Sequence, residues 1–154
     1  MKNASRITAT IALVALATGT ALATEGVSPG AVDRIAVVET RCPTFSWGMD
    51  GDAVAYELVA YVLPVDGAQQ VELTAEGEVL YTRVSGAATS WTPSAEQCFA
   101  PGGRYVWFVR AVSEMIGDEV VEAGEWSAGR YFEVPAGPSA EELARAVEVL
   151  KQWE

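Results

Sequence analysis

Histidine is missing from all 154 residues of the chain. Its absence excludes a Ser/His/Asp triad, a Cys/His dyad and the histidine-containing zinc and iron sites. The sequence also contains no glycine-rich phosphate-binding loop and no nucleophile elbow. An enzyme would have to work with carboxylates, lysine, tyrosine or cysteine alone. We therefore expect a protein that is not an enzyme and that holds neither a metal nor a cofactor.

Basic residues are few: 10 Lys and Arg residues stand against 21 Asp and Glu residues, and the net charge is −11. No nucleic-acid partner is expected, because binding to phosphates requires a basic surface. Two carboxylates held across a cleft could form a glycosidase site, whereas an acidic loop is more often simply solvated. The acidic residues that gather around one predicted loop are Glu114, Asp118, Glu119, Glu122 and Glu125.

Long apolar runs are also rare, and the clearest one lies at the N-terminus. Lys2 and a second basic residue precede an apolar run from Ile7 to about Leu16, and Ala21-Leu22-Ala23 fits the small-x-small cleavage rule. We predict a signal peptide of bacterial type over residues 1–23, a mature chain that begins at Thr24, and a secreted or periplasmic location without a membrane span. An uncleaved anchor is the alternative, although the run is short for a span.

The chain has two cysteines, Cys42 and Cys98. In an exported protein an even pair of cysteines predicts one disulfide. Two buried free thiols are the alternative. A metal site is not expected, because other soft ligands are lacking.

Residues that favour strands recur in short runs between Gly, Pro and Asp, which favours an all-β sandwich over residues 33–134 after a leader at 24–32. Both faces of the run at 54–63 are apolar, so both should be covered. A loop is expected at 117–124. The expected strands cover 34–40, 43–47, 54–63, 70–73, 78–84, 90–92, 102–114 (after an initial turn) and 130–134.

The stretch at 102–114 is expected to be the central strand. Its residues alternate between two faces, because successive side chains of a strand point to opposite sides. Tyr105, Trp107, Val109 and Ala111 share one face, and Val106, Phe108 and Arg110 share the other.

An amphipathic helix is predicted at residues 139–154. Ser139 and Glu142 form a capping box, and the apolar residues Leu143, Val147 and Leu150 recur at helical spacing. This stripe could cover an apolar patch on the outer face of the sheet, or pair with copies of itself. We expect the helix to fold back over its own sheet, because a short helix is weak alone. The expected patch consists of Val59, Tyr61, Val106 and Phe108.

The order of these features resembles the fibronectin type III family. Trp47 matches the family's second-strand tryptophan, Tyr56-Glu57-Leu58 its third-strand Tyr-x-Leu pattern, and 101–105 (Pro-Gly-Gly-Arg-Tyr) the corner before its sixth strand. Val109 and Ala111 continue the motif. The resemblance covers about residues 33–134 and implies an immunoglobulin-like sandwich in which Tyr105 is a structural tyrosine corner. The pair of cysteines departs from typical members.

The stretch at 124–130 (Gly-Glu-Trp-Ser-Ala-Gly-Arg) is similar to half of the Trp-Ser-x-Trp-Ser box of cytokine-receptor modules. Trp126 and Ser127 match the first half, and the second half is absent. The resemblance implies that Arg110 stacks on Trp126 in a structural cation–π contact. Receptor signalling is not implied.

These observations favour an exported, non-catalytic interaction module whose partner is a protein or glycan of the cell envelope. The alternative is a structural or assembly component that forms oligomers through its C-terminal helix. A carboxylate-based hydrolase comes third, together with a carbohydrate-binding platform built from the five Trp and five Tyr residues, most of which we expect in the core.

Overall fold

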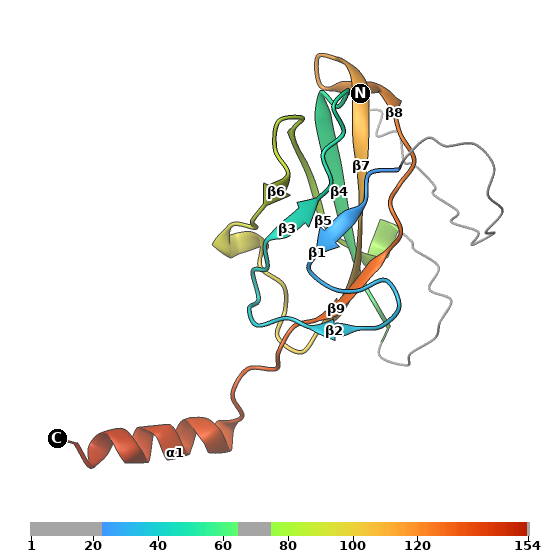
Figure 1. Ribbon diagram of the computed structural model, residues 1–154. Helices are drawn as coiled ribbons and strands as arrows, with labels where there is room; N and C mark the ends of the chain where they lie inside the picture. The colour runs from blue at the N-terminus through green and yellow to red at the C-terminus, as the bar shows by residue number, and fades with distance from the viewer. Residues whose placement is uncertain (1–22, 65–74, 154) are drawn as a thin grey trace.

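The computed structural model describes residues 23–64 and 75–153 (Figure 1). Nearly all of the expected signal peptide and the expected strand at 70–73 lie outside the described residues. In chain order the elements are β1 (Gly26–Ser28), β2 (Ala36–Val37), β3 (Phe45–Trp47), β4 (Ala55–Val62), η1 (Ala75–Gly77), β5 (Glu78–Ser85), β6 (Ser90–Trp91), η2 (Ala95–Gln97), β7 (Arg104–Ile116), β8 (Glu119–Ala123), β9 (Arg130–Glu133) and α1 (Ala140–Lys151).

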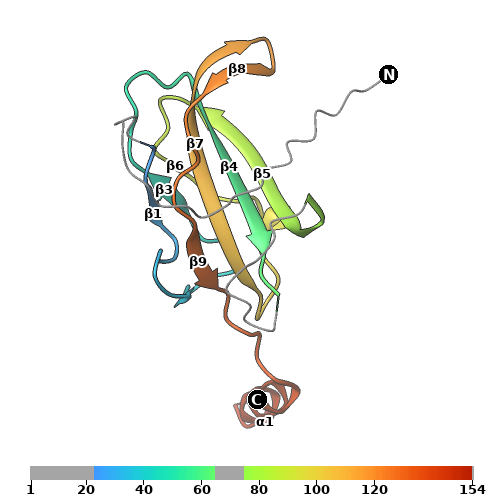
Figure 2. The ribbon, with the colours of Figure 1, turned by 90° about the vertical axis from the view of Figure 1, so that its right-hand side faces the viewer.

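The strands of the described residues form two sheets. The smaller sheet has the order β1-β3-β6, and the larger has the order β2-β9-β7-β4-β5, with β8 paired to β7. Strand pairs are antiparallel except for β2 and β9, which run parallel. Figure 2 shows the smaller sheet packed on one side of the larger. The predicted all-β, sandwich-like architecture with one C-terminal helix is confirmed.

The main core lies between the two sheets and is rich in aromatic side chains. Phe45 of β3 packs edge-on against Trp107 of β7, with ring centroids 5.0 Å apart. The indole N–H of Trp107 donates to the carbonyl oxygen of Pro29 at 2.8 Å, so its polar atom is satisfied inside the core. The alternation expected along β7 is confirmed. Its residues in the main core are Tyr105, Trp107, Val109 and Ala111.

The outer face of the larger sheet is also covered, as the apolar pattern of β4 predicts. Val59, Val106 and Phe108 are buried there. The expected patch of Val59, Tyr61, Val106 and Phe108 does lie together on this face, but α1 does not cover it. Side chains of the sheet and of the segment after β8 cover it instead, and the partly buried residues that pack on this cluster are Tyr61, Leu63, Trp126 and Tyr131.

Two segments expected to lie outside the strands are part of the sheets. The presumed leader contains β1, which pairs with β3, and Arg130 donates to the carbonyl oxygens of Gly26 and Gly30 at 3.1 and 2.6 Å. The presumed loop at 117–124 contains β8. Gly117 has φ of 60°, which permits the tight turn that folds β8 back on β7.

The helix α1 has the predicted cap but not the predicted position. The Ser139 hydroxyl accepts from the Glu142 N–H at 3.2 Å, and the Glu142 carboxylate accepts from the Ser139 N–H at 2.7 Å. No residue of α1 is buried, and both views show the helix away from the sheets (Figures 1 and 2). The expectation that it folds back is wrong, because the sheet's own side chains already cover the outer face.

Candidate functional site

A buried carboxylate organises the outer face of the larger sheet. Glu57 of β4 is 3% exposed and lies in register with Arg83 on β5 and Arg110 on β7. Its two oxygens accept from Arg83 Nη2 at 3.0 Å and from Arg110 Nη2 at 2.6 Å. The Tyr81 hydroxyl donates to the same carboxylate. One buried anion is thus held by donors from both neighbouring strands.

These donors decide the charge of Glu57. Burial raises the pKa of the carboxyl, whereas the hydrogen bonds from Tyr81, Arg110 and Arg83 lower it more, so that the pKa lies below 4.5. The carboxylate is therefore ionised near neutral pH and accepts hydrogen bonds only. Its oxygens are occupied by three protein donors, which makes Glu57 a structural anion rather than an acid poised to donate a proton.

Trp126 extends this cluster to the segment that follows β8. The guanidinium carbon of Arg110 lies 4.5 Å from the centroid of the Trp126 ring, which is the stacking geometry that the sequence resemblance implies. Ser127 joins the same segment to β7: its N–H donates to the Val109 oxygen at 2.8 Å, and its hydroxyl accepts from the Val109 N–H at 3.0 Å. Trp126 and Ser127 thus hold this segment against β7, the first through the stack on Arg110 and the second through two hydrogen bonds to Val109.

We expect Arg110→Lys to lower the free energy of unfolding by about 1 kcal/mol, because lysine keeps the charge but loses the planar stack on Trp126 and the forked contact with Glu57. Urea denaturation would measure the change. The matched control Arg104→Lys alters an ion pair with Glu133 that is partly exposed, and it should change stability by less than about 0.5 kcal/mol. Equal stability of Arg110→Lys and wild type would contradict the structural role of the stack.

Tyr105 has the hydrogen bonds of a tyrosine corner. Its hydroxyl accepts from the Ala100 N–H at 3.1 Å and donates to the Ala100 oxygen at 3.4 Å. A Cβ atom on Gly103 would lie 2.2 Å from this hydroxyl, so glycine is required there. Trp47 is buried against Tyr56, with ring centroids 5.4 Å apart. Both residues contribute to the core rather than to a surface site.

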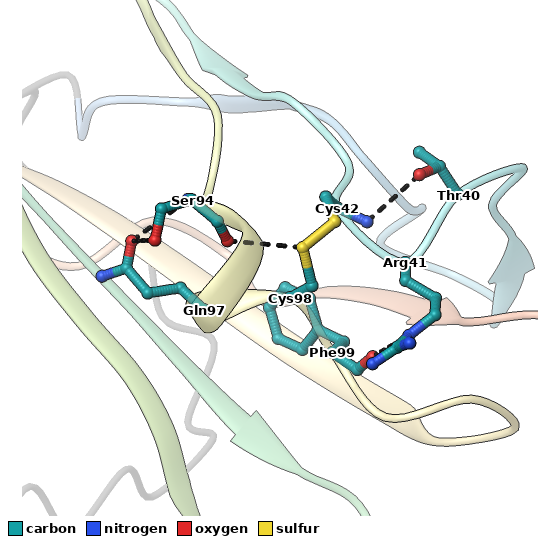
Figure 3. Close-up of a disulfide and its surroundings, with 7 residues drawn as sticks. All are labelled: Thr40, Arg41, Cys42, Ser94, Gln97, Cys98 and Phe99. Atoms are coloured by element: carbon teal, nitrogen blue, oxygen red, sulfur yellow. Dashed lines mark hydrogen bonds between the residues drawn. A yellow bond between two sulfur atoms is a disulfide. The ribbon is translucent and has the colours of Figure 1, made fainter.

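The disulfide between Cys42 and Cys98 is present (Figure 3). It joins the segment before β3 to the crossover between β6 and β7. Next to it, the Phe99 N–H donates to the Arg41 oxygen at 2.9 Å, and Arg41 Nε donates to the Phe99 oxygen at 2.9 Å. The disulfide and these two hydrogen bonds therefore hold the crossover where Phe99 enters the core, and the Thr44 and Thr92 hydroxyls add a third hydrogen bond between the same segments.

An acidic cleft of about 660 Å³ opens at one end of the sandwich. It lies where the N-terminal segment, the turn between β3 and β4, and the β8 region meet. Among the residues that the structure describes, no Lys or Arg lines it. Within the described residues, no group of three or more acidic or other ligand side chains could hold a metal ion. The carboxylates that line it are Glu25, Asp50, Asp52, Glu122 and Glu125.

Only part of the predicted acidic loop contributes to this cleft. Glu122 and Glu125 line it, while Glu114, Asp118 and Glu119 do not. The other three carboxylates were not predicted to belong to this cleft, because they come from segments far away in the chain. The role of Glu57 was not predicted either, although one acidic residue in an otherwise apolar strand was the available signal.

Most aromatic residues of the described chain belong to the fold rather than to a sugar-binding platform. Trp107 and Tyr56 are fully buried, and Trp91 packs against the main core. Trp153 is the exception, because it lies beyond the last turn of α1 and is 84% exposed.

Within the described part of the chain, no helix is both long and apolar enough to cross a membrane. No protein-family model and no curated protein matches the sequence.

Proposed function

We propose that the protein is an exported, non-catalytic interaction module of fibronectin type III type, and that α1 carries its contact surface. The strand order supports the fold type: β1-β3-β6 corresponds to strands A, B and E of immunoglobulin-like sandwiches, and β9-β7-β4-β5 to strands G, F, C and C′. The tyrosine corner of Tyr105 supports it as well. The disulfide is typical of an oxidising compartment and supports export.

The observation that carries the interaction role is the exposed apolar stripe of α1. Leu143 and Val147 are 53% and 50% exposed, and Leu150 is 67% exposed. A helix this short is weakly stable in water by itself, and most helices are stabilised by packing an apolar face. The sandwich does not supply that packing. A partner that covers the stripe would therefore both stabilise the helix and hide its apolar surface.

The carboxylates of the described residues support a non-catalytic role. Glu57 is the only buried carboxylate among them, and its oxygens are taken by two arginines and a tyrosine. The remaining acidic side chains of the described residues are exposed or half-buried, on loops, strands and helices, where solvation is the ordinary outcome.

A second copy of the chain is the alternative partner, in which case the protein is an assembly component of the envelope. The charges of α1 are compatible with this arrangement. Glu141 and Glu142 lie in the first turn and Lys151 in the last, so two antiparallel helices would place opposite charges beside each other. Light scattering over a range of protein concentrations separates this alternative from a heterologous partner.

We expect Leu150→Asp to abolish association through the helix while it leaves the melting temperature of the sandwich unchanged, because α1 contributes nothing to the core. Calorimetry would measure the melting temperature. Solution mass and cross-linking to candidate partners in an envelope extract would measure association.

Ala144→Asp is the matched control, since it adds the same charge to α1 outside the apolar stripe and should leave association intact. A lower melting temperature for Leu150→Asp would show that the helix docks on the sandwich. If Leu150→Asp and Ala144→Asp associate as the wild type does, α1 is not the contact surface.

A further inference from the structure

The chain is fixed in the fold immediately after the predicted cleavage site. The Gly48 N–H donates to the Glu25 oxygen at 2.8 Å, and Gly26 pairs with Trp47 in the smaller sheet. Thr24 is 7% exposed, and its hydroxyl has no hydrogen-bond partner. The backbone of Thr24 is therefore held in place by the residues that follow it.

Thr24 also lines the acidic cleft. The cleft collects carboxylates from three parts of the chain, and neither lysine nor arginine is among its lining residues at 23–64 and 75–153. Nearby carboxylates repel one another when no cation lies among them, and they favour a positive charge placed between them. The cleft is thus an electrostatic site for a cation, although its carboxylates are too dispersed to hold a metal ion.

We propose that the missing cation is the α-ammonium group of Thr24, which signal-peptide cleavage creates. Hydrolysis of the Ala23–Thr24 peptide bond by a signal peptidase adds the hydroxyl of water to the Ala23 carbonyl and leaves an amine on Thr24. This amine takes up a proton at neutral pH. Removal of the leader thus places one positive charge and three N–H donors on a residue that lines the cleft. The inference rests on the proposed export.

The charged side chains of the described residues that line the cleft are all carboxylates, while Arg130 donates to the Gly26 oxygen two residues after Thr24. These carboxylates should raise the pKa of the amine above its usual value of about 7.7 to 8.0. A raised pKa adds stability that is fully present below the unfolded value and is lost as the pH rises through the folded value. The groups concerned are Glu25 beside the terminus, Asp50 and Asp52 in the turn before β4, Glu122 on β8, and Glu125 after β8.

The test compares three forms of the mature chain: one that begins at Thr24, one that begins at Ala23, and one that begins at Thr24 with an acetylated amine. The extra residue moves the charge by about 3.8 Å, and the acetyl group removes it. NMR titration gives the pKa of the amine, and thermal melts from pH 6 to 10 give stability. We expect the free Thr24 terminus to have a raised pKa and a higher melting temperature than the acetylated chain, a difference that vanishes as the pH rises through the folded pKa of the amine. The chain that begins at Ala23, a residue that also lines the cleft, should show a smaller gain than the free Thr24 terminus.

Glu122→Gln should lower the amine pKa, whereas the control Glu119→Gln, which lies on β8 but outside the cleft, should not. A normal amine pKa, or equal melting of the free and acetylated chains, would overturn the inference and leave export standing. Amino-terminal sequencing of the exported protein distinguishes the two claims, because a start at another residue would overturn the cleavage prediction itself.

Discussion

Replacement of both Cys42 and Cys98 by serine should lower the free energy of unfolding by about 4 kcal/mol. The disulfide spans a sequence separation of 56 residues, and in the chain-entropy model a loop of this length restricts the unfolded chain by that amount. The crossover before β7 should also loosen, since its remaining hydrogen bonds to the segment before β3 are those between Arg41 and Phe99 and the one between the Thr44 and Thr92 hydroxyls. Urea denaturation of both chains would measure the loss.

The melting temperature should fall by at least about 15 °C, given the usual shift of 4 to 8 °C per kcal/mol for a small domain. A reducing agent should lower the melting temperature of the wild type to a similar extent and leave the double variant unaffected. Thr40→Ala is a control beside the disulfide, because it removes only the hydrogen bond to the Cys42 N–H. Two thiols that react with an alkylating reagent in the exported protein would refute the predicted disulfide.

Local periodicity explains the parts of the fold that the sequence predicts correctly. The alternation along β7 places Trp107 in the core and Phe108 on the opposite face. The apolar residues on both faces of β4 predict that both faces are covered, and they are. The capping box at Ser139 marks the start of α1. In each case the deciding interaction lies within one element, so the pattern of a few residues is sufficient.

The predictions that the structure corrects concern interactions between segments that are far apart in the chain. The presumed leader becomes β1 because β3 lies beside it, and the outer face is covered because Trp126 and Tyr131 reach over it. Because other side chains already cover this face, docking of α1 there would bury little additional apolar surface. The acidic cleft likewise forms from three separate segments. Composition reveals the acidic residues, but only the topology brings Glu25 and Glu122 to one cleft.

Glu57→Gln should lower the free energy of unfolding by about 3 kcal/mol, because removal of one partner of a buried ion pair leaves the other charge without compensation. Glutamine keeps the shape of the side chain but not its charge. Arg110 and Arg83 would then lie 2.6 and 3.0 Å from the position of a neutral amide. Chemical denaturation at pH 7 would measure the change. Glu78→Gln on β5 is the matched control and should stay within about 0.5 kcal/mol of the wild type, since this carboxylate is exposed.

The pH dependence separates the charge of Glu57 from its packing. Because the folded pKa of this carboxyl is lowered, its contribution is present above the unfolded value near 4.5 and is lost as the pH falls through the folded value. The stability difference between wild type and Glu57→Gln should therefore shrink as the pH falls from 4.5 toward 2. A difference that stays constant over this range would assign the loss to packing. A difference near zero at pH 7 would show that water can replace the three donors, and the cluster would then not be what fixes Trp126 against the sheet.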